Sequence, residues 1–447
     1  MERVTPQNLV FLSADDDRQR LHVGSVGRYE GPAPSLDELA ARVGAALPLV
    51  PRARQRIVEV PLRLSRPVWV DDVDFDLGHH LTRLDLGPDA PVPELHELVG
   101  ELVAQPFDRE RPLWGMWLID GLADGQWALV TVTHQVMVDG VAGTPLLAVL
   151  LDLTPEPREL PSVPWMPRDE PSDLRLVADA LSDLAVDPTE VGRVVQSGLR
   201  VQGAAMKWAA ERLSGRPTVE HHPSGLSGPI SNERVWAAAD LDLDLVRTVR
   251  AARGVTVNDV VLATVTGAFR RLLDHRGVDD DVEHVRIAVP LSVADGHRYE
   301  NEVTVVSYDL PVGVADPSER LELVVSQSTA LEDQGVAADV LRALAGNPSA
   351  RLLAMGSRMA AMAVRRQRSY HSLVVNVPGP SSDRYLLGRR LLESHPLVPL
   401  VDGIRLAIGA VSLRDRIHLG ITSDAPHSED LPVFVDALNE ELVLLHG

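Results

Sequence analysis

A histidine, an amide, an aspartate and a glycine lie within one short stretch, His134-Gln135-Val136-Met137-Val138-Asp139-Gly140. Histidine suits proton transfer because its ordinary pKa lies near neutral pH. A neutral imidazole can take the proton from an alcohol, amine or thiol while that group attacks a thioester carbonyl. A glycine lets the backbone approach a substrate closely. The residue types therefore fit acyl transfer, although a plain strand followed by a turn would read the same way.

The first part of the chain alternates strand-like and helix-like segments around this motif. Residues 128–133 are rich in β-branched side chains and predict a buried strand that ends at the motif. Ser35 precedes acidic residues and an apolar spacing near 3.6, which predicts a helix over 35–46. Further strands are expected at 67–73 and 115–119, and further helices at 93–104 and 143–153. We therefore expect a mixed α/β domain over residues 1–168.

Composition changes mark the middle of the chain. Prolines crowd residues 153–169, and proline resists helix continuation, so this segment predicts a connector. A long helical stretch is expected over 172–214, followed by a Pro-, Ser- and Gly-rich loop over 221–231. The predicted boundaries give a helical connector and interdomain loop over 169–232.

The second half, residues 233–447, repeats the α/β style, and its similar size leaves room for a duplicated fold, although the sequence shows no short-period repeat. Helices are expected at 242–253, 256–276 and 431–445. Strands are expected at 285–290, 303–310, 373–377, 404–411 and 416–422.

Composition narrows the class of protein. The net charge of −21 would be repelled by phosphate backbones, so we expect no nucleic-acid partner. The chain has no cysteine, which excludes disulfides, thiolate nucleophiles and cysteine zinc sites. It shows no secretion leader and no apolar run of the roughly 20 residues that span a bilayer. A cytoplasmic protein is expected, with peripheral contact to a membrane or lipid droplet as an alternative.

Several segments in a fixed order resemble the bacterial wax ester synthase/acyl-CoA:diacylglycerol acyltransferase family, whose active-site motif is HHxxxDG. The similarity runs nearly end to end, through residues 22–24, 51–56, 112–114, 134–140, 256–259, 289–293, 375–380 and Asp424. It implies an α/β fold of two chloramphenicol-acetyltransferase-like domains, with mixed sheets flanked by helices and an active-site channel between them. It also implies acyl-CoA as donor co-substrate, diacylglycerol or a long-chain alcohol as acceptor, and no metal or prosthetic group.

The resemblance also implies roles for particular residues. His134 matches the first motif histidine, which is usually considered structural, and Gln135 matches the second, the general base. Asp139 and Gly140 match outright, and the family aspartate is typically buried beside an arginine. Three further matches, expected near the substrate, are Asn258, Asp259 and Asn376.

Gln135 departs from the family pattern, because an amide cannot accept a proton at neutral pH. Four interpretations stay open. In the first, Gln135 orients an acceptor whose proton leaves through water or His134; in the second, it serves different chemistry on the same scaffold. In the third, the protein only binds an acyl-CoA or carrier-bound ligand, and in the fourth, the glutamine is an engineered substitution. Side chains alternate along a strand, so His134 is expected to face away from a site that Gln135 faces.

Other candidates are given plainer interpretations. The pair His79-His80 is expected in a half-buried strand with one surface histidine, and His221-His222 in a solvated loop. The acidic run 71–76 is expected to be a solvated turn rather than a cation site. Residues 349–370 carry arginines and methionines on separate stripes, which fits an ordinary core helix or one beside an acyl channel. No ligand spacing predicts a metal site.

Overall fold

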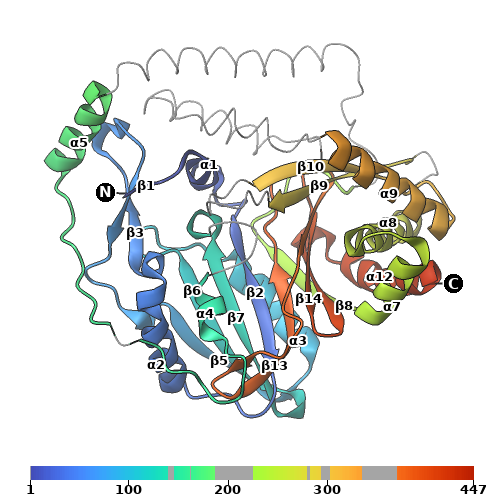
Figure 1. Ribbon diagram of the computed structural model, residues 1–447, viewed down its shortest axis with the longest axis horizontal. Coiled ribbons are helices and arrows are strands. Elements are labelled where there is room, and N and C mark those ends of the chain that lie inside the picture. The colour runs from blue at the N-terminus through green and yellow to red at the C-terminus, as the bar shows by residue number, and fades with distance from the viewer. Residues whose placement is uncertain are drawn as a thin grey trace.

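Two six-stranded mixed sheets form the centre of the computed structural model, and a three-stranded sheet lies beside the first of them (Figure 1). The structure describes residues 2–138, 145–161, 163–186, 225–278, 282–292, 303–334 and 370–446. The first large sheet has the order β12-β13-β2-β7-β6-β5, the second β10-β9-β11-β14-β15-β8, and the small sheet β1-β4-β3. The α/β class and the two-domain architecture expected from the sequence are confirmed.

The strands are β1 (Glu2–Arg3), β2 (His22–Tyr29), β3 (Gln55–Val58), β4 (Val68–Asp71), β5 (Leu81–Ala90), β6 (Trp114–Leu122), β7 (Gln126–His134), β8 (Arg234–Asp242), β9 (Val285–Ser292), β10 (Val303–Leu310), β11 (Ser372–Val377), β12 (Tyr385–Leu386), β13 (Arg389–Leu397), β14 (Leu406–Leu413) and β15 (Arg416–Asp424). The β5–β6, β9–β11 and β11–β14 pairs are parallel, and the other pairs are antiparallel.

The helices are α1 (Pro6–Ala14), α2 (Leu36–Ala46), α3 (Val92–Ala104), α4 (Pro145–Leu150), α5 (Asp173–Val186), α7 (Leu243–Arg253), α8 (Val257–His275), α9 (Pro317–Gln334) and α12 (Asp430–His446). Of the helix predicted over 172–214, only α5 falls within the described residues. None of the described helices has the length and apolar character needed to cross a membrane.

Local sequence explains where the helices begin. Ser35 and Glu38 form a reciprocal capping box at the start of α2, and Leu39, Val43 and Ala46 form its buried face. Thr256 and Asp259 form the same arrangement at the start of α8. Because α8 is buried on nearly every side, it becomes the central helix of the second half.

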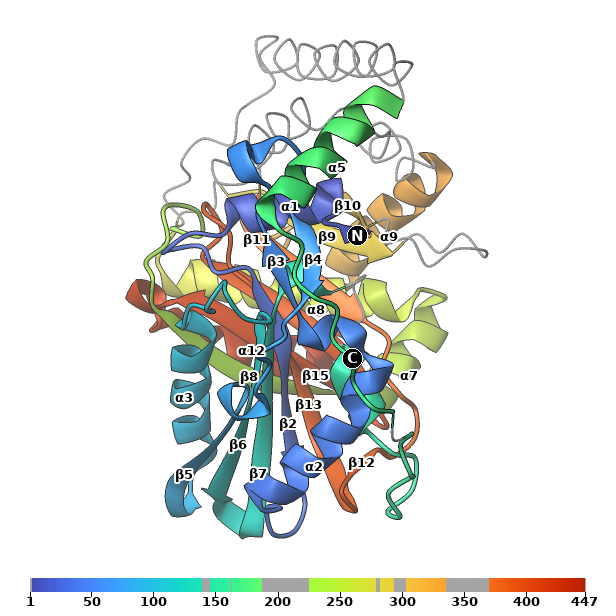
Figure 2. The same cartoon turned by 90° about the vertical axis from the view of Figure 1, so that its left-hand side faces the viewer.

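Helices cover both large sheets. Figure 2 shows the first sheet between α2 on one side and α3 on the other. The helices α7, α8, α9 and α12 gather on the outer side of the second sheet (Figure 1). Helix α3 also packs against β8, where a Cβ added to Gly100 would lie 2.5 Å from the carbonyl oxygen of Arg234. The two halves therefore meet through close packing at α3.

The first sheet is completed by strands from the far end of the chain. Strands β12 and β13 come from residues 385–397, and β13 pairs antiparallel with β2 from Leu397 opposite Gly24 to Leu391 opposite Tyr29. The predicted division placed these residues with the second domain. The strand at 389–397 was not predicted from the sequence, and a strand pattern carries no information about which sheet the strand joins, so this exchange between the halves was not anticipated.

Candidate active site

Strand β7 ends at His134, the first residue of the motif, and a 3₁₀ turn over Gln135–Met137 follows. The Nδ1 atom of His134 accepts a hydrogen bond from the Val136 backbone N–H at 3.0 Å, so the imidazole caps this turn. The expectation that His134 and Gln135 face opposite ways assumed an extended strand through both residues. That premise was wrong, because strand geometry stops at His134. Asp139 and Gly140 lie outside the described residues.

His134 is buried and faces a carboxylate. Its Nε2 atom lies 3.2 Å from Oδ2 of Asp15, and the two side chains are 2% and 8% exposed. Because Nδ1 accepts from a backbone N–H, the ring proton resides on Nε2, on the side of Asp15. The Nδ1 lone pair of His134 is thus used by the backbone, and Nε2 carries the ring proton, so neither nitrogen offers a lone pair to an incoming hydroxyl. This geometry supports a structural role for His134.

Asp15 is an anion in a largely buried setting. Burial by itself would raise the pKa of Asp15, but the contact with His134 and the nearby His22 and Arg109 lower it below its ordinary value. The nearest Arg109 nitrogen lies 3.6 Å from Oδ2 of Asp15. The carboxylate therefore stays charged at neutral pH and holds the His134 ring in position.

His22 lies opposite His134 across the β2–β7 ladder. Since a carbonyl can only accept, Nδ1 of His22 donates to the Val103 carbonyl at 3.0 Å. Its ring packs 4.5 Å from that of Phe107 and 6.1 Å from that of His134, centre to centre. Burial, with a smaller effect of His134, lowers the pKa of His22 to about 4. His22 is therefore neutral at physiological pH.

Gln135 is half-buried and held by its backbone. Its N–H donates to the Leu21 carbonyl at 2.8 Å, and its carbonyl accepts from the N–H of Val138 at 3.1 Å. The side-chain amide makes no hydrogen bond to another residue in the part of the chain that the structure describes. The position expected to hold the general base thus carries a group that can bind a ligand by hydrogen bonds but cannot take its proton.

The predicted residues of the second half form a separate group. Asn376, on β11, donates through Nδ2 to Oδ1 of Asn258, at the start of α8, at 3.2 Å. Asp259 instead accepts from the N–H and hydroxyl of Thr256 and from the hydroxyl of Ser328 at 2.5–2.9 Å. Its carboxylate is therefore occupied in fixing the start of α8. Within the described ranges, no hydrogen bond or ion pair joins the two asparagines to His134 or Gln135.

The partners of His134 could not be recognised from the sequence. Asp15 lies in an acidic run, Asp15-Asp16-Asp17, which is typical of a solvated surface, and only the strand pairing brings His22 opposite His134. Had the pairing of β2 with β7 been known, their register would have placed His22 opposite His134.

The remaining candidates have structural roles where the structure describes them. His79 ends a 3₁₀ turn over Leu77–His79, so the strand expected there was wrong, because the Asp76 carboxylate caps the turn. His79 is exposed as predicted, whereas His80 is buried and stacks 4.4 Å from the Trp114 ring. Asp71 ends β4 and accepts hydrogen bonds from Gln55 and Arg168. Residues 221–222 and 349–369 lie outside the described ranges.

Comparison with known proteins adds family information. A model described as the wax ester synthase/diacylglycerol acyltransferase catalytic domain matches residues 4–261, and one described as the WS/DGAT C-terminal domain matches 299–446. Similar proteins include a probable diacylglycerol O-acyltransferase of Mycobacterium tuberculosis, 32% identical over 438 residues, covering 95% of this chain and 91% of that protein. A putative diacylglycerol O-acyltransferase of Mycobacterium bovis has the same identity and coverage.

Solved structures share the fold. A wax ester synthase/diacylglycerol acyltransferase from Marinobacter aquaeolei is 24% identical, with a TM-score of 0.72 and coverage of 100% of this chain and 98% of that one. A trichothecene 15-O-acetyltransferase from Fusarium sporotrichioides is 12% identical, with a TM-score of 0.60 and coverage of 99% and 94%.

Proposed function

Because the chain belongs to the wax ester synthase/diacylglycerol acyltransferase family and is an acyltransferase, we propose that it transfers a fatty acyl group from acyl-CoA to diacylglycerol or a long-chain alcohol. We further propose that Gln135 makes this transfer slower than it would be with histidine at the same position. The observation that carries this second part is the Gln135 amide, which has no hydrogen-bond partner among the described residues, beside a His134 ring whose Nδ1 accepts from the backbone and whose Nε2 faces Asp15.

The proposed reaction balances without a metal or prosthetic group. The acceptor oxygen forms a bond to the thioester carbonyl carbon, and the carbon–sulfur bond to CoA breaks. The hydroxyl proton ends on the CoA thiol. In this scheme the Gln135 amide accepts a hydrogen bond from the hydroxyl and orients it, while water carries the proton. Loss of a positioned base typically lowers a rate by about 10²–10⁴.

The test measures release of CoA from palmitoyl-CoA, with diacylglycerol or hexadecanol as acceptor, and the ester product. Gln135→His should raise kcat/KM by about 10²–10⁴, because a base returns to its place. The matched control is Gln105→His, which adds a histidine at an exposed position at the end of α3. Equal rates for wild type, Gln135→His and Gln135→Ala would contradict a role for this position.

A second candidate is an acyl-CoA-binding protein without turnover. The lack of a proton acceptor at position 135 favours it. In that case calorimetry detects binding of palmitoyl-CoA to the wild type, but CoA release stays at the uncatalysed level. Only the Gln135→His protein then forms ester. Ester formation by the wild type above that level would exclude this candidate.

A further inference from the structure

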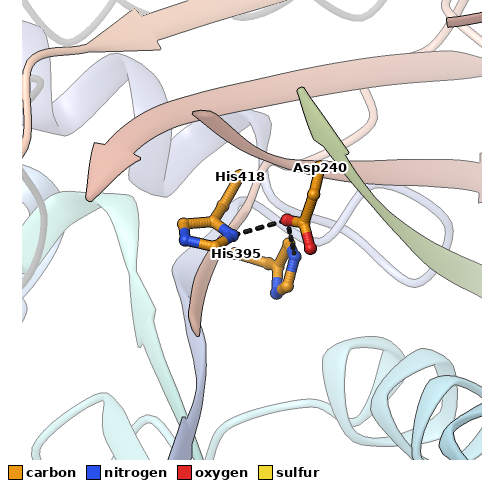
Figure 3. Close-up of side chains that lie close together, drawn as sticks. All are labelled: Asp240, His395 and His418. Carbon is orange, nitrogen blue, oxygen red and sulfur yellow. Dashed lines mark hydrogen bonds and ion pairs between the residues drawn. The ribbon is translucent and has the colours of Figure 1, made fainter. Parts of the chain in front are cut away.

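Three side chains far apart in the sequence meet where the two large sheets face each other: Asp240 of β8, His395 of β13 and His418 of β15 (Figure 3). Strand β13 belongs to the first sheet, whereas β8 and β15 are neighbours in the second. The cluster therefore joins the two halves of the molecule. The family resemblance and the acyl-transfer site account for none of these residues.

The two histidines converge on one carboxylate oxygen of Asp240. Oδ1 of Asp240 lies 3.0 Å from Nε2 of His395 and 2.5 Å from Nδ1 of His418. The two histidines are 5% and 1% exposed, whereas the side chain of Asp240 is 33% exposed. Two buried imidazoles thus point their nitrogens at the same atom, and solvent reaches the site from the carboxylate side.

We propose that Asp240, His395 and His418 bind a divalent transition-metal ion of the Zn²⁺ class. Two imidazole nitrogens and a carboxylate oxygen are a donor set that such ions prefer. The three donor atoms lie within 4.8 Å of one another. Ligands about 2.0–2.1 Å from one tetrahedral ion are about 3.3 Å apart, so a small opening of the cluster admits the metal. Water fills the fourth position on the open side of Asp240.

The surroundings hold the two histidines in place. Their rings lie edge to face at 5.0 Å between centres, and Trp236 packs against His395 at 6.0 Å. A Cβ added to Gly420 would lie 1.9 Å from the carbonyl oxygen of Pro396, so β13 and β15 are in backbone contact beside the cluster. Ligands fixed on packed strands lose little freedom when an ion binds.

A bound ion would replace the two ring protons that now point at Asp240 and would link β13 to the second sheet. The proposed role is structural, since no hydrogen bond, ion pair or ring contact among the described residues joins the cluster to the Asp15–His134 pair. The proposal is independent of the acyl acceptor and of the role of Gln135.

The test uses the full-length chain without a histidine tag, freed of metal by a chelator. Titration with Zn²⁺ against a chromophoric chelator should give one tight site per chain, and Co²⁺ should give visible d–d absorption bands. His395→Gln, His418→Gln and Asp240→Asn should each weaken Zn²⁺ binding by more than about 100-fold, because loss of even an outer partner of a ligand often costs 10–100-fold. His79→Gln, at an exposed histidine, is the matched control and should leave binding unchanged.

Two outcomes overturn the proposal: no stoichiometric binding by the wild type, or binding that survives all three ligand variants. If a histidine variant fails to fold, Zn²⁺ binding by Asp240→Asn and thermal unfolding of the wild type decide between the outcomes. Metal bound to the folded state must raise Tm as Zn²⁺ concentration rises. An unchanged wild-type Tm without Co²⁺ bands would identify a purely hydrogen-bonded cluster.

Discussion

Replacing His22 by asparagine should make the free energy of unfolding less sensitive to pH. Burial lowers the pKa of His22 from 6.5 to about 4, and its Nδ1 already donates to the Val103 carbonyl. Between those two values the unfolded chain binds a proton that the folded chain does not, so stability falls as pH falls. Below about pH 4 both states are protonated and the loss is complete.

The size of this effect follows from the two pKa values. Relative to pH 7, the His22 contribution to the free energy of unfolding falls by about 2 kcal/mol at pH 5 and by about 3 kcal/mol at pH 4. Urea unfolding of wild type and His22→Asn at pH 7 and pH 5 measures this change in the free energy of unfolding. The comparison uses the change with pH, so the loss of packing in the variant cancels.

One cancellation and one control variant separate His22 from other titrating groups. His96 also has a pKa lowered to about 4 by burial and is present in both proteins, so its contribution cancels as well. His446→Asn, at an exposed histidine at the end of α12, should keep the wild-type pH dependence. Equal pH dependence of wild type and His22→Asn, or a His22 NMR resonance that titrates near pH 6.5, would contradict the assignment of a buried neutral imidazole.

Three substitutions test the packing around the sheets and α8, each by urea unfolding. Gly420→Ala forces a Cβ against the β13 backbone and should cost about 3 kcal/mol or more, whereas Gly44→Ala on α2, where an added Cβ would meet only Leu77 Cδ2 at 4.0 Å, should be neutral or stabilising. Arg42→Met removes the guanidinium that lies 2.6 Å from the buried carboxylate of Asp152 and leaves only that of Arg158, at 3.6 Å, so it should cost about 3 kcal/mol, and a loss below about 1 kcal/mol would contradict the pairing. Asp259→Ala should lower stability by about 1–2 kcal/mol through the lost cap, with kcat/KM per folded molecule unchanged; a fall in kcat/KM would instead indicate substrate contact.

Local patterns predicted most elements well, because short-range signals determine them. The strand predicted at 303–310 coincides with β10, and the helix predicted at 256–276 includes α8 together with its capping residue Thr256. The strand at 128–133 lies within β7. In each case side-chain periodicity and a capping or turn residue lie next to each other in the chain.

Contacts between residues far apart in the chain could not be predicted from local sequence patterns. The partner of His134 is Asp15, and the cluster at Asp240 is completed by two histidines from other strands. These contacts depend on strand order, which no local pattern encodes. The strand assumed through Gln135 failed for a related reason, since the imidazole of His134 captures a backbone N–H and turns the chain.

The return of β13 to the first sheet has a consequence for biosynthesis. Strand β2 is made early, yet one of its two neighbours leaves the ribosome only after residue 397. Until then the nascent N-terminal half presents a bare strand edge, the kind of surface on which chains aggregate. A fragment cut at residue 232 would keep that edge permanently, so the halves are not interchangeable modules, and a chimera must exchange residues 385–397 together with the first sheet.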